Sequence, residues 1–349
     1  MNTTKNYIAF LFSICCYASN ISFAQNKTAD TGFNQLITIN EVVITATRTP
    51  KSIGEIPVPV QVITKKMLQQ TGSQKLIDIL QQQTGLVLAD NPLGQALQGY
   101  PNPFGSGIQL QGLDPAYTLI LLDGEPLTGR NAGILNLGRV AIGNIRQIEI
   151  VKGPATSLYG SDALAGVINI ITEKPKNNNA TVQLHNAGNN TWGLTASGSI
   201  KKNKTALQLF ANRYSSRGYD LDKNIYGQTA DPFRNYSVAA KLFYDINTNT
   251  QIQSSARLFT QKQFNNYLVY TNARPEAVDG SSIETDLSIS NQLHHRFHKN
   301  IKLISRFYIT GYRDNATVYL QKTGLPFDRS FMQQLLIKPE VQMEFGKKK

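Results

Sequence analysis

The stretch HHRFH holds three histidines, His294, His295 and His298, and imidazole nitrogens are common ligands of transition metals. The surrounding residues alternate between apolar and polar as in a β-strand, where neighbouring side chains point to opposite faces. His294 and His295 are therefore expected on different faces, and His298 is expected at the end of the strand, beside a short turn. This spacing disfavours a shared metal ion, and we predict no metal site.

The loop GPATSLYG, residues 153–160, invites comparison with loops that cradle phosphates. Such loops carry Lys followed by Ser or Thr after the last glycine, and no such pair follows Gly160. The chain also has no Ser/His/Asp order and no carboxylate pair in a recognisable site. Both of its cysteines, Cys15 and Cys16, lie in the N-terminal segment. We therefore predict that the protein is not an enzyme.

The first 24 residues have the features of a secretory signal peptide. Lys5 precedes an apolar run from Tyr7 to Cys16, and Ser22 and Ala24 have the spacing that signal peptidase recognises. A transmembrane anchor is the alternative, but the run is shorter than the roughly 20 residues that span a bilayer. The net charge of +12 is scattered among turns, which disfavours nucleic acid as a partner of this exported chain.

Beyond the signal, residues 50–175 alternate short apolar strands with short helices. VPVQVI (58–63), YTLILLDG (117–124) and QIEIVKG (147–153) are predicted strands, and KKMLQQ and SQKLIDILQQQ (73–83) are predicted helices. Gly153-Pro154 ends a strand, Tyr159-Gly160 forms a second tight turn, and Gly166 precedes the run Val167 to Ile171. That run has no wet face, so it must be buried, and the pattern predicts an α/β domain.

From residue 180 to 349 the dominant pattern is two-residue alternation. Tyr236, Val238 and Leu242 are expected on one apolar face, and Arg234, Ser237 and Lys241 on the polar face. Tight turns at 201–204, 247–250 and 298–300 are expected to interleave with long polar connections at about 215–233, 262–282 and 314–328. About eight long strands joined in this way are typical of an antiparallel transmembrane β-barrel, with a soluble β-sandwich as the less favoured alternative.

Three stretches together carry a family resemblance. They are EVVITATR (41–48), YTLILLDGEPLTGR (117–130) and IEIVKGPATSLYGSDALAGVINIIT (148–172). In this order they resemble the TonB box and the plug domain of TonB-dependent outer-membrane receptors, with a barrel behind them. The resemblance implies residues 25–49 as a periplasmic segment, residues 50–175 as the plug and residues 180–349 as the N-terminal part of the barrel.

The resemblance also implies partners and site residues. The strand-like run from Glu41 to Thr47 has no neighbouring strand to pair with, and in the family such a segment adds as a strand to TonB, which works with an inner-membrane energising complex. The alternative is an N-terminal strand of the plug itself. The implied TonB box is Glu41, Val42, Val43, Ile44, Thr45, Ala46 and Thr47.

Candidate ligand contacts are expected at the plug apices, facing the extracellular side, although ordinary structural roles remain open for them. The long loop 88–107 carries Tyr100 and Phe104, and a second apex carries Thr128, Gly129, Arg130 and Asn131. The residues expected to shape the plug are Gly153, Pro154, Tyr159, Gly160 and Gly166.

The expected function is import of a ferric siderophore across the outer membrane of a Gram-negative cell, with the barrel in contact with outer-membrane lipid. Haem or cobalamin is the alternative cargo, and a non-transporting surface protein or adhesin is the alternative of another class. No resident cofactor is expected, since the iron complex would be cargo. Two departures stand out: Gln111-Gly112 replaces the Arg-Gly of many family plugs, and eight strands compare with about 22 in plugged transporters. We therefore expect a truncated or fragmentary receptor.

Overall fold

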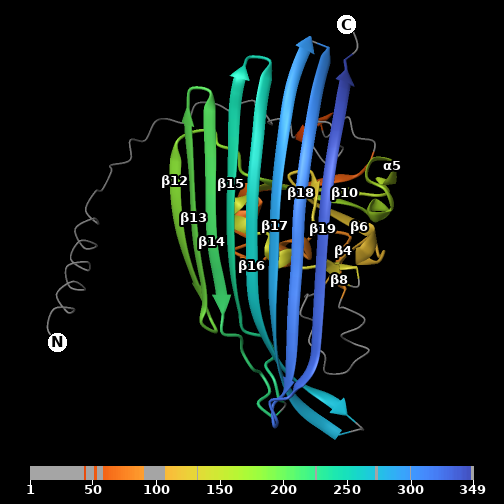
Figure 1. Ribbon diagram of the computed structural model, residues 1–349, viewed down its shortest axis with the longest axis vertical. Coiled ribbons are helices and arrows are strands. Elements are labelled where there is room, and N and C mark those ends of the chain that lie inside the picture. The colour runs from red at the N-terminus through yellow and green to blue at the C-terminus, as the bar shows by residue number, and fades with distance from the viewer. Residues whose placement is uncertain are drawn as a thin grey trace, which may run out of the picture. The chain divides into compact units, whose positions relative to one another are not determined.

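The computed structural model describes residues 43–44, 51–52, 58–89, 107–131, 133–224, 226–271, 274–298 and 300–346 (Figure 1). These residues belong to one unit, Val42–Lys349. The predicted signal peptide lies outside the described residues, as do Tyr100 and Phe104.

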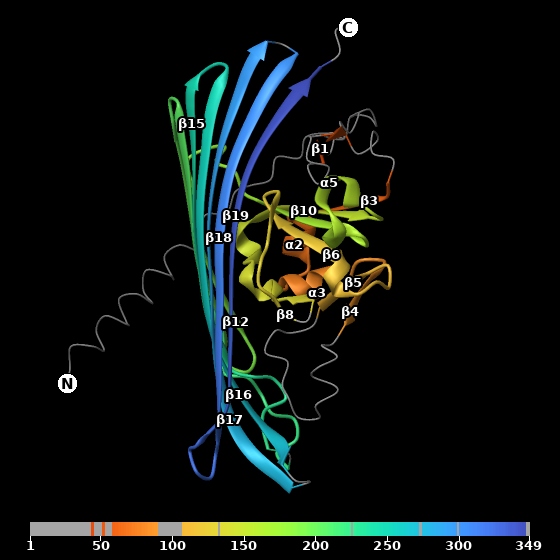
Figure 2. The same cartoon turned by 45° about the vertical axis from the view of Figure 1, so that its right-hand side comes forward.

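The first half of this unit contains a five-stranded sheet with short helices beside it (Figure 2). Its strand order is β3(Val60–Thr64), β10(Ile145–Lys152), β11(Gly166–Thr172), β6(Thr118–Leu122) and β7(Glu125–Pro126). Strands β11 and β6 are parallel, and the other neighbours are antiparallel. The helices are α2(Lys65–Gln70), α3(Leu76–Leu80) and α5(Thr156–Tyr159).

Shorter elements complete this half. Three two-stranded sheets are formed by β1(Val43–Ile44) with β2(Lys51–Ser52), β4(Leu86–Ala89) with β5(Gly107–Leu110), and β8(Arg130–Asn131) with β9(Ile134–Leu135). The 3-10 helices are η2(Pro115–Tyr117), η3(Leu137–Arg139), η4(Ile142–Asn144) and η5(Ser161–Ala163). The predicted strands and helices of this domain are confirmed, with shorter bounds.

The strand β11 is buried along its whole length, as its lack of a wet face predicts. The run is not wholly apolar, however, because Asn169 lies in its middle with no exposed surface. Its side-chain oxygen accepts a hydrogen bond of 3.1 Å from the backbone N–H of Gly124. A buried amide is tolerated here because it has a partner, and it ties β11 to the turn after β6.

Two glycines hold the turns beside β10 and β11. Gly160 ends α5 with φ of 82° and ψ of −166°, a conformation that is essentially restricted to glycine. At Gly166, φ is +148° and a Cβ atom would lie 2.2 Å from the carbonyl oxygen of Val151. A side chain at Gly166 is therefore excluded by the neighbouring backbone.

The second half of the chain is an eight-stranded sheet in which each strand pairs antiparallel with the next. Its strands are β12(Asn179–Ala187), β13(Thr191–Lys202), β14(Thr205–Ser216), β15(Phe233–Asn247), β16(Thr250–Thr271), β17(Arg274–His298), β18(Ile301–Leu320) and β19(Pro326–Phe345). The predicted number of strands and the tight turns are confirmed. In β15 the predicted face holds, because Val238 is 53% exposed while Lys241 is 6% exposed.

The connections differ from the prediction in two places. Residues 262–282 belong almost entirely to β16 and β17, and residues 314–320 belong to β18, so only the connection between β14 and β15 is long. In this extension Tyr267, Val269 and Val278 form a buried apolar cluster on one face, while Phe264 and Tyr270 are exposed on the other, so apolar residues on both faces obscured the alternation. Arg234 was also misplaced: it is exposed and has the same parity as Tyr236, so it lies on the apolar face.

No helix among the described residues has the length and apolar character needed to cross a membrane.

Candidate functional site

The plug half lies against one face of the eight-stranded sheet (Figure 2), and we call that sheet the wall. The attachment centres on Arg139, which ends η3 and has no exposed surface. Its guanidinium lies 2.8 Å from a carboxylate oxygen of Asp286 and 3.5 Å from one of Glu284, both on β17. Arg257 on β16 approaches the same Asp286 oxygen at 2.7 Å. Two buried carboxylates of the wall are thus compensated by one cation from the plug and one from the wall.

Further contacts fix the Arg139 side chain in place. Its guanidinium donates to the carbonyl oxygen of Thr128 at 2.6 Å and lies 4.9 Å from the ring centre of Tyr312. The side-chain amide of Asn136 donates to Glu284 at 2.6 Å. We refer to Arg139, Glu284, Asp286 and Arg257 as the plug–wall latch.

A second attachment lies at the turn between β6 and β7. The carboxylate of Asp123 is 2.7 Å from the ammonium of Lys241 and also accepts hydrogen bonds from Thr172. Burial alone would raise the pKa of Asp123, but Lys241 and Thr172 together hold it below its usual range. At Glu125 burial prevails over Lys338, 3.1 Å away, and the pKa of that carboxyl is raised.

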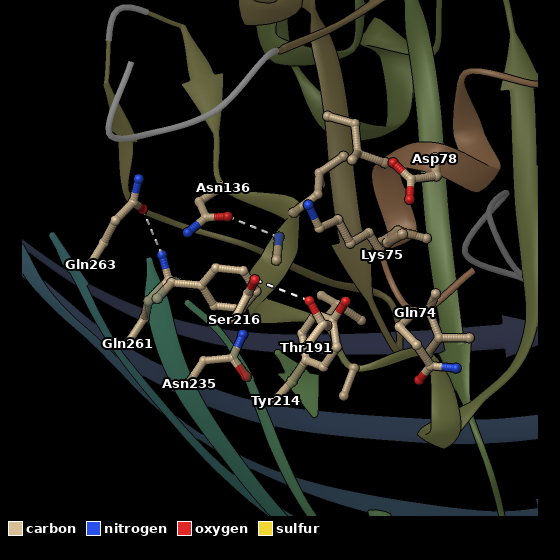
Figure 3. A pocket seen from close by; sticks show the side chains of 18 of the residues that line it. Gln74, Lys75, Asp78, Asn136, Thr191, Tyr214, Ser216, Asn235, Gln261 and Gln263 are labelled. Carbon is tan, nitrogen blue, oxygen red and sulfur yellow. Dashed lines mark hydrogen bonds between the residues drawn. The ribbon is translucent and has the colours of Figure 1, made fainter. Parts of the chain in front are cut away.

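A cavity of about 510 Å³ lies between plug and wall, near the long connection between β14 and β15 (Figure 3). The plug contributes Lys75 and Asp78 at α3, and Leu88 before the apical loop. The wall contributes mainly amide and aromatic side chains. These are Asn189, Asn212, Tyr214, Tyr219, Phe233, Asn235, Gln261 and Gln263.

Charge in this cavity is low and nearly balanced among the described residues. Lys75 lies 5.9 Å from the ring centre of Phe233, so its positive charge faces an aromatic surface. Asp231 accepts a hydrogen bond of 3.4 Å from the side chain of Gln263. Burial raises the pKa of Asp231 to about 6, and the bond from Gln263 offsets only part of that effect. The cavity therefore suits a ligand with many hydrogen-bonding groups and little net charge.

The predicted apex from Thr128 to Asn131 lies at the wall, where its residues make structural contacts. Gly129 donates its backbone N–H to Gln334 at 2.8 Å, and its φ is +85°. The guanidinium of Arg130 donates to the backbone carbonyls of Pro115, Gly133 and Thr118, and burial lowers its pKa. These contacts favour a positioning role for Arg130, while ligand contact at this apex stays a prediction.

The apical loop is described only at its two ends. β4 and β5 pair through Leu88 with Ile108 and Ala89 with Gly107, so both strands run to the base of the loop. Leu88 lines the cavity, so the base of the apical loop borders the cavity. The roles of Tyr100 and Phe104 stay predictions.

Part of the predicted TonB box is described. Val43 and Ile44 form β1, which pairs with Ser52 and Lys51 of β2 in the same chain. The run therefore has a partner strand within the chain, as the alternative interpretation allowed. Pairing with TonB stays a prediction.

The plug–wall latch was missed by the sequence analysis. Its plug member, Arg139, lies 118 residues from Arg257 and 147 residues from Asp286 in the sequence, and no local pattern joins them. Gln111, in place of the arginine of many family plugs, was a usable signal that another residue makes the charged contact between plug and wall. Gln111 has φ of 55° and donates its backbone N–H to the carbonyl oxygen of Gly85. The cations of the latch are instead Arg139 and Arg257. Among the described residues, no group of three or more His, Cys, Asp or Glu side chains is placed to hold a metal ion.

Comparisons with known proteins agree with this architecture. Residues 52–167 match the TonB-dependent Receptor Plug Domain family. Vitamin B12 transporters BtuB of Vibrio vulnificus are similar to the chain. The protein from strain CMCP6 is 29% identical over 186 residues, which cover 53% of this chain and 29% of the relative. The protein from strain YJ016 is 27% identical over 267 residues, which cover 75% of this chain and 41% of the relative.

Among solved structures, a G324V mutant of the ferric enterobactin receptor PfeA of Pseudomonas aeruginosa has the same fold. Its TM-score is 0.62 at 17% identity, over 86% of this chain and 47% of that one. The chain spans less than half the length of the curated relatives that it matches.

Proposed function

We propose that this chain, whose residues 52–167 match the TonB-dependent Receptor Plug Domain family and whose wall is antiparallel, serves the import of a metal complex across the outer membrane of a Gram-negative cell. The observation that carries the proposal is the cavity between plug and wall, bordered by the base of the apical loop. The plug is attached beside it through the plug–wall latch. Cargo binding in the cavity and displacement of the plug are then separate events, as active import requires.

TonB is the proposed source of energy. The segment from Glu41 to Thr47 is rich in β-branched residues, and backbone hydrogen bonds would supply most of the binding in strand addition. Residues 1–24 are proposed as the signal peptide that directs export. No catalytic role is proposed.

The charge of the cavity supports one cargo class over another. A tris-catecholate ferric siderophore carries several negative charges, whereas the described lining has Lys75 as its cation beside Asp78 and Asp231. A cobalamin carries peripheral amide groups, which pair well with the amides of Asn212, Asn235 and Gln261. We therefore place a corrinoid ahead of a ferric siderophore as the proposed cargo.

The test is binding of cyanocobalamin and of a ferric tris-catecholate to a full-length receptor that carries this chain. We expect cyanocobalamin to bind more tightly, and we expect Asn212→Leu with Asn235→Leu to weaken its binding by roughly tenfold or more. Lys176→Leu, in the connection between β11 and β12 and outside the cavity lining, is the control. Tighter binding of the catecholate complex would reverse the order of the cargo classes, and no binding of any metal complex would reject the function.

A further inference from the structure

The face of the wall that points away from the plug carries a basic row at one end. Its members are Arg213 on β14, Arg234 on β15, Lys262 on β16, Arg313 on β18 and Arg329 on β19, all of them exposed. We call this set the basic belt. It lies at the end of the wall next to the long connection 217–232.

Strand pairing places these residues in three neighbouring outward rows, with Arg329 in the outermost one opposite Thr317. Arg234 is directly opposite Lys262, and Arg213 is opposite Tyr236 in the adjacent row. That adjacent row continues through Thr260 and Thr285 to Arg313. The next row toward the tight turns is apolar and exposed, and it consists of Val238, Leu258, Leu287 and Leu335.

The basic belt has no acidic partner among the described residues. The inward-facing cations Lys241, Arg257 and Lys338 each form an ion pair, whereas no member of the basic belt does. Within the described parts of β14 to β19, the outward-facing acid is Asp279, which lies two rows farther out and accepts a hydrogen bond from Tyr226. The basic belt is therefore not neutralised by ion pairs within the described chain.

The facing pair Arg234 and Lys262 indicates that an anion completes this surface. Like charges directly opposite each other on neighbouring strands destabilise a sheet, and an anion bound between them would relieve this repulsion. The Lys262 ammonium lies 4.8 Å from the ring centre of Phe264, so it is held at the surface by an aromatic side chain. An apolar band topped by cations fits an anionic amphiphile, with acyl chains on the leucines and phosphates at the cations.

We propose that the basic belt binds the phosphate groups of a phosphorylated glycolipid of the outer leaflet, of the lipid A kind. This inference rests on the proposed outer-membrane location, in which long connections face the cell exterior. The two guanidinium groups of Arg213 and Arg234 offer bidentate donors to phosphate, and Lys262 adds a point charge. The bound lipid would fix the height of the wall in the membrane.

The test uses a full-length receptor with this wall, in phosphatidylcholine nanodiscs that contain either bisphosphorylated or fully dephosphorylated lipid A. Native mass spectrometry of the released receptor reports the bound lipid. We expect the parent to retain the bisphosphorylated lipid preferentially, and Arg234→Gln with Lys262→Gln to lower that preference roughly ten- to thirtyfold. Lys202→Gln is the matched control, because Lys202 also faces outward but lies at the tight-turn end.

Equal preference in the parent and the double variant would overturn the proposal, as would equal retention of the two lipids by the parent. Displacement of the lipid by inorganic phosphate at similar concentration would also overturn it, since the surface would then take free phosphate. Heat-modifiable gel mobility checks that each variant is folded. Cargo binding is measured on the same samples: its absence in the parent would reject the proposed import function without touching the lipid result.

Discussion

Arg139 is the residue on which the attachment of the plug to the wall depends most. If Arg139→Met removes its guanidinium, Glu284 and Asp286 stay buried with less compensation. We expect the free energy of plug attachment to fall by about 3 to 5 kcal/mol, measured by urea-dependent protease cleavage of the plug. Lys65→Met is the control, because the Lys65–Glu173 pair is exposed and its loss should cost about 0 to 1 kcal/mol. Similar effects of the two substitutions would show that the latch does not hold the plug.

Gly129 and Gly124 form a matched pair for testing close contact with the wall. Both have φ of +85°, but a Cβ atom at Gly129 would lie 2.5 Å from the Tyr312 ring, whereas at Gly124 nothing lies within 4 Å. Each alanine substitution carries the backbone strain of about 1 kcal/mol or more, and only Gly129→Ala adds a steric clash. We expect faster protease cleavage of the plug in Gly129→Ala than in Gly124→Ala. Equal cleavage rates would mean that the Tyr312 ring moves aside freely.

Asp231 should make the loop 217–232 sensitive to pH. The folded pKa of Asp231, raised to about 6 by burial, exceeds the ordinary 3.8 of an accessible carboxyl, so the folded loop prefers the protonated form. The stabilising contribution is complete below pH 3.8 and is lost as the pH rises through about 6. Protection factors of the loop amides, which correct for the base-catalysed rise of intrinsic exchange, should therefore be higher at about pH 5 than at about pH 7.5. Asp231→Asn should remove this difference, and an unchanged difference would assign the titration to another group.

At the scale of elements, the wall strands were predictable because each separates two environments. Val238 and Lys241 in β15 already indicate an outward apolar face and an inward polar face from their spacing. The extension of β16 and β17 beyond Lys262 was not predictable, since its apolar side chains lie on both faces, with Tyr267 buried and Tyr270 exposed. The latch was not predictable either, because one arginine in a 3-10 helix meets two carboxylates of β17 only after the sheet forms.

Whether the outward face of β15 meets lipid can be tested directly. Leu242 is 40% exposed on the outward face, and Leu242→Arg should destabilise the wall by about 2 to 4 kcal/mol if that face meets the bilayer centre. Gln253, opposite Phe243 on the inward face, is the control, since Gln253→Arg keeps its charge among polar groups. Urea unfolding in lipid vesicles measures both variants. Equal destabilisation would favour a soluble β-sandwich over a membrane barrel.

At the scale of the whole molecule, import requires that events on the two sides of the plug be separable. The cavity lies near the connection between β14 and β15, whereas the run from Glu41 to Thr47 precedes the plug and is proposed to bind TonB on the periplasmic side. In the structure Val43 and Ile44 are paired with Ser52 and Lys51. If TonB adds a strand here, it needs backbone N–H and C=O groups of this segment. These groups must either lie on the edge that does not pair with β2 or become available when the pairing with β2 opens.

Proline substitutions separate the two pairings. Val43→Pro removes a backbone N–H and fixes φ within the proposed TonB box, so uptake of labelled cargo should fall to background while cell-surface binding is retained. Ser52→Pro weakens the pairing of β1 with β2 from the other side and leaves the TonB box intact, so uptake should remain near the parental level. Uptake and binding are measured side by side in cells that carry the full-length receptor. Parental uptake in Val43→Pro would reject the TonB box, and loss of uptake in Ser52→Pro would instead make the β1–β2 pairing itself a requirement for import.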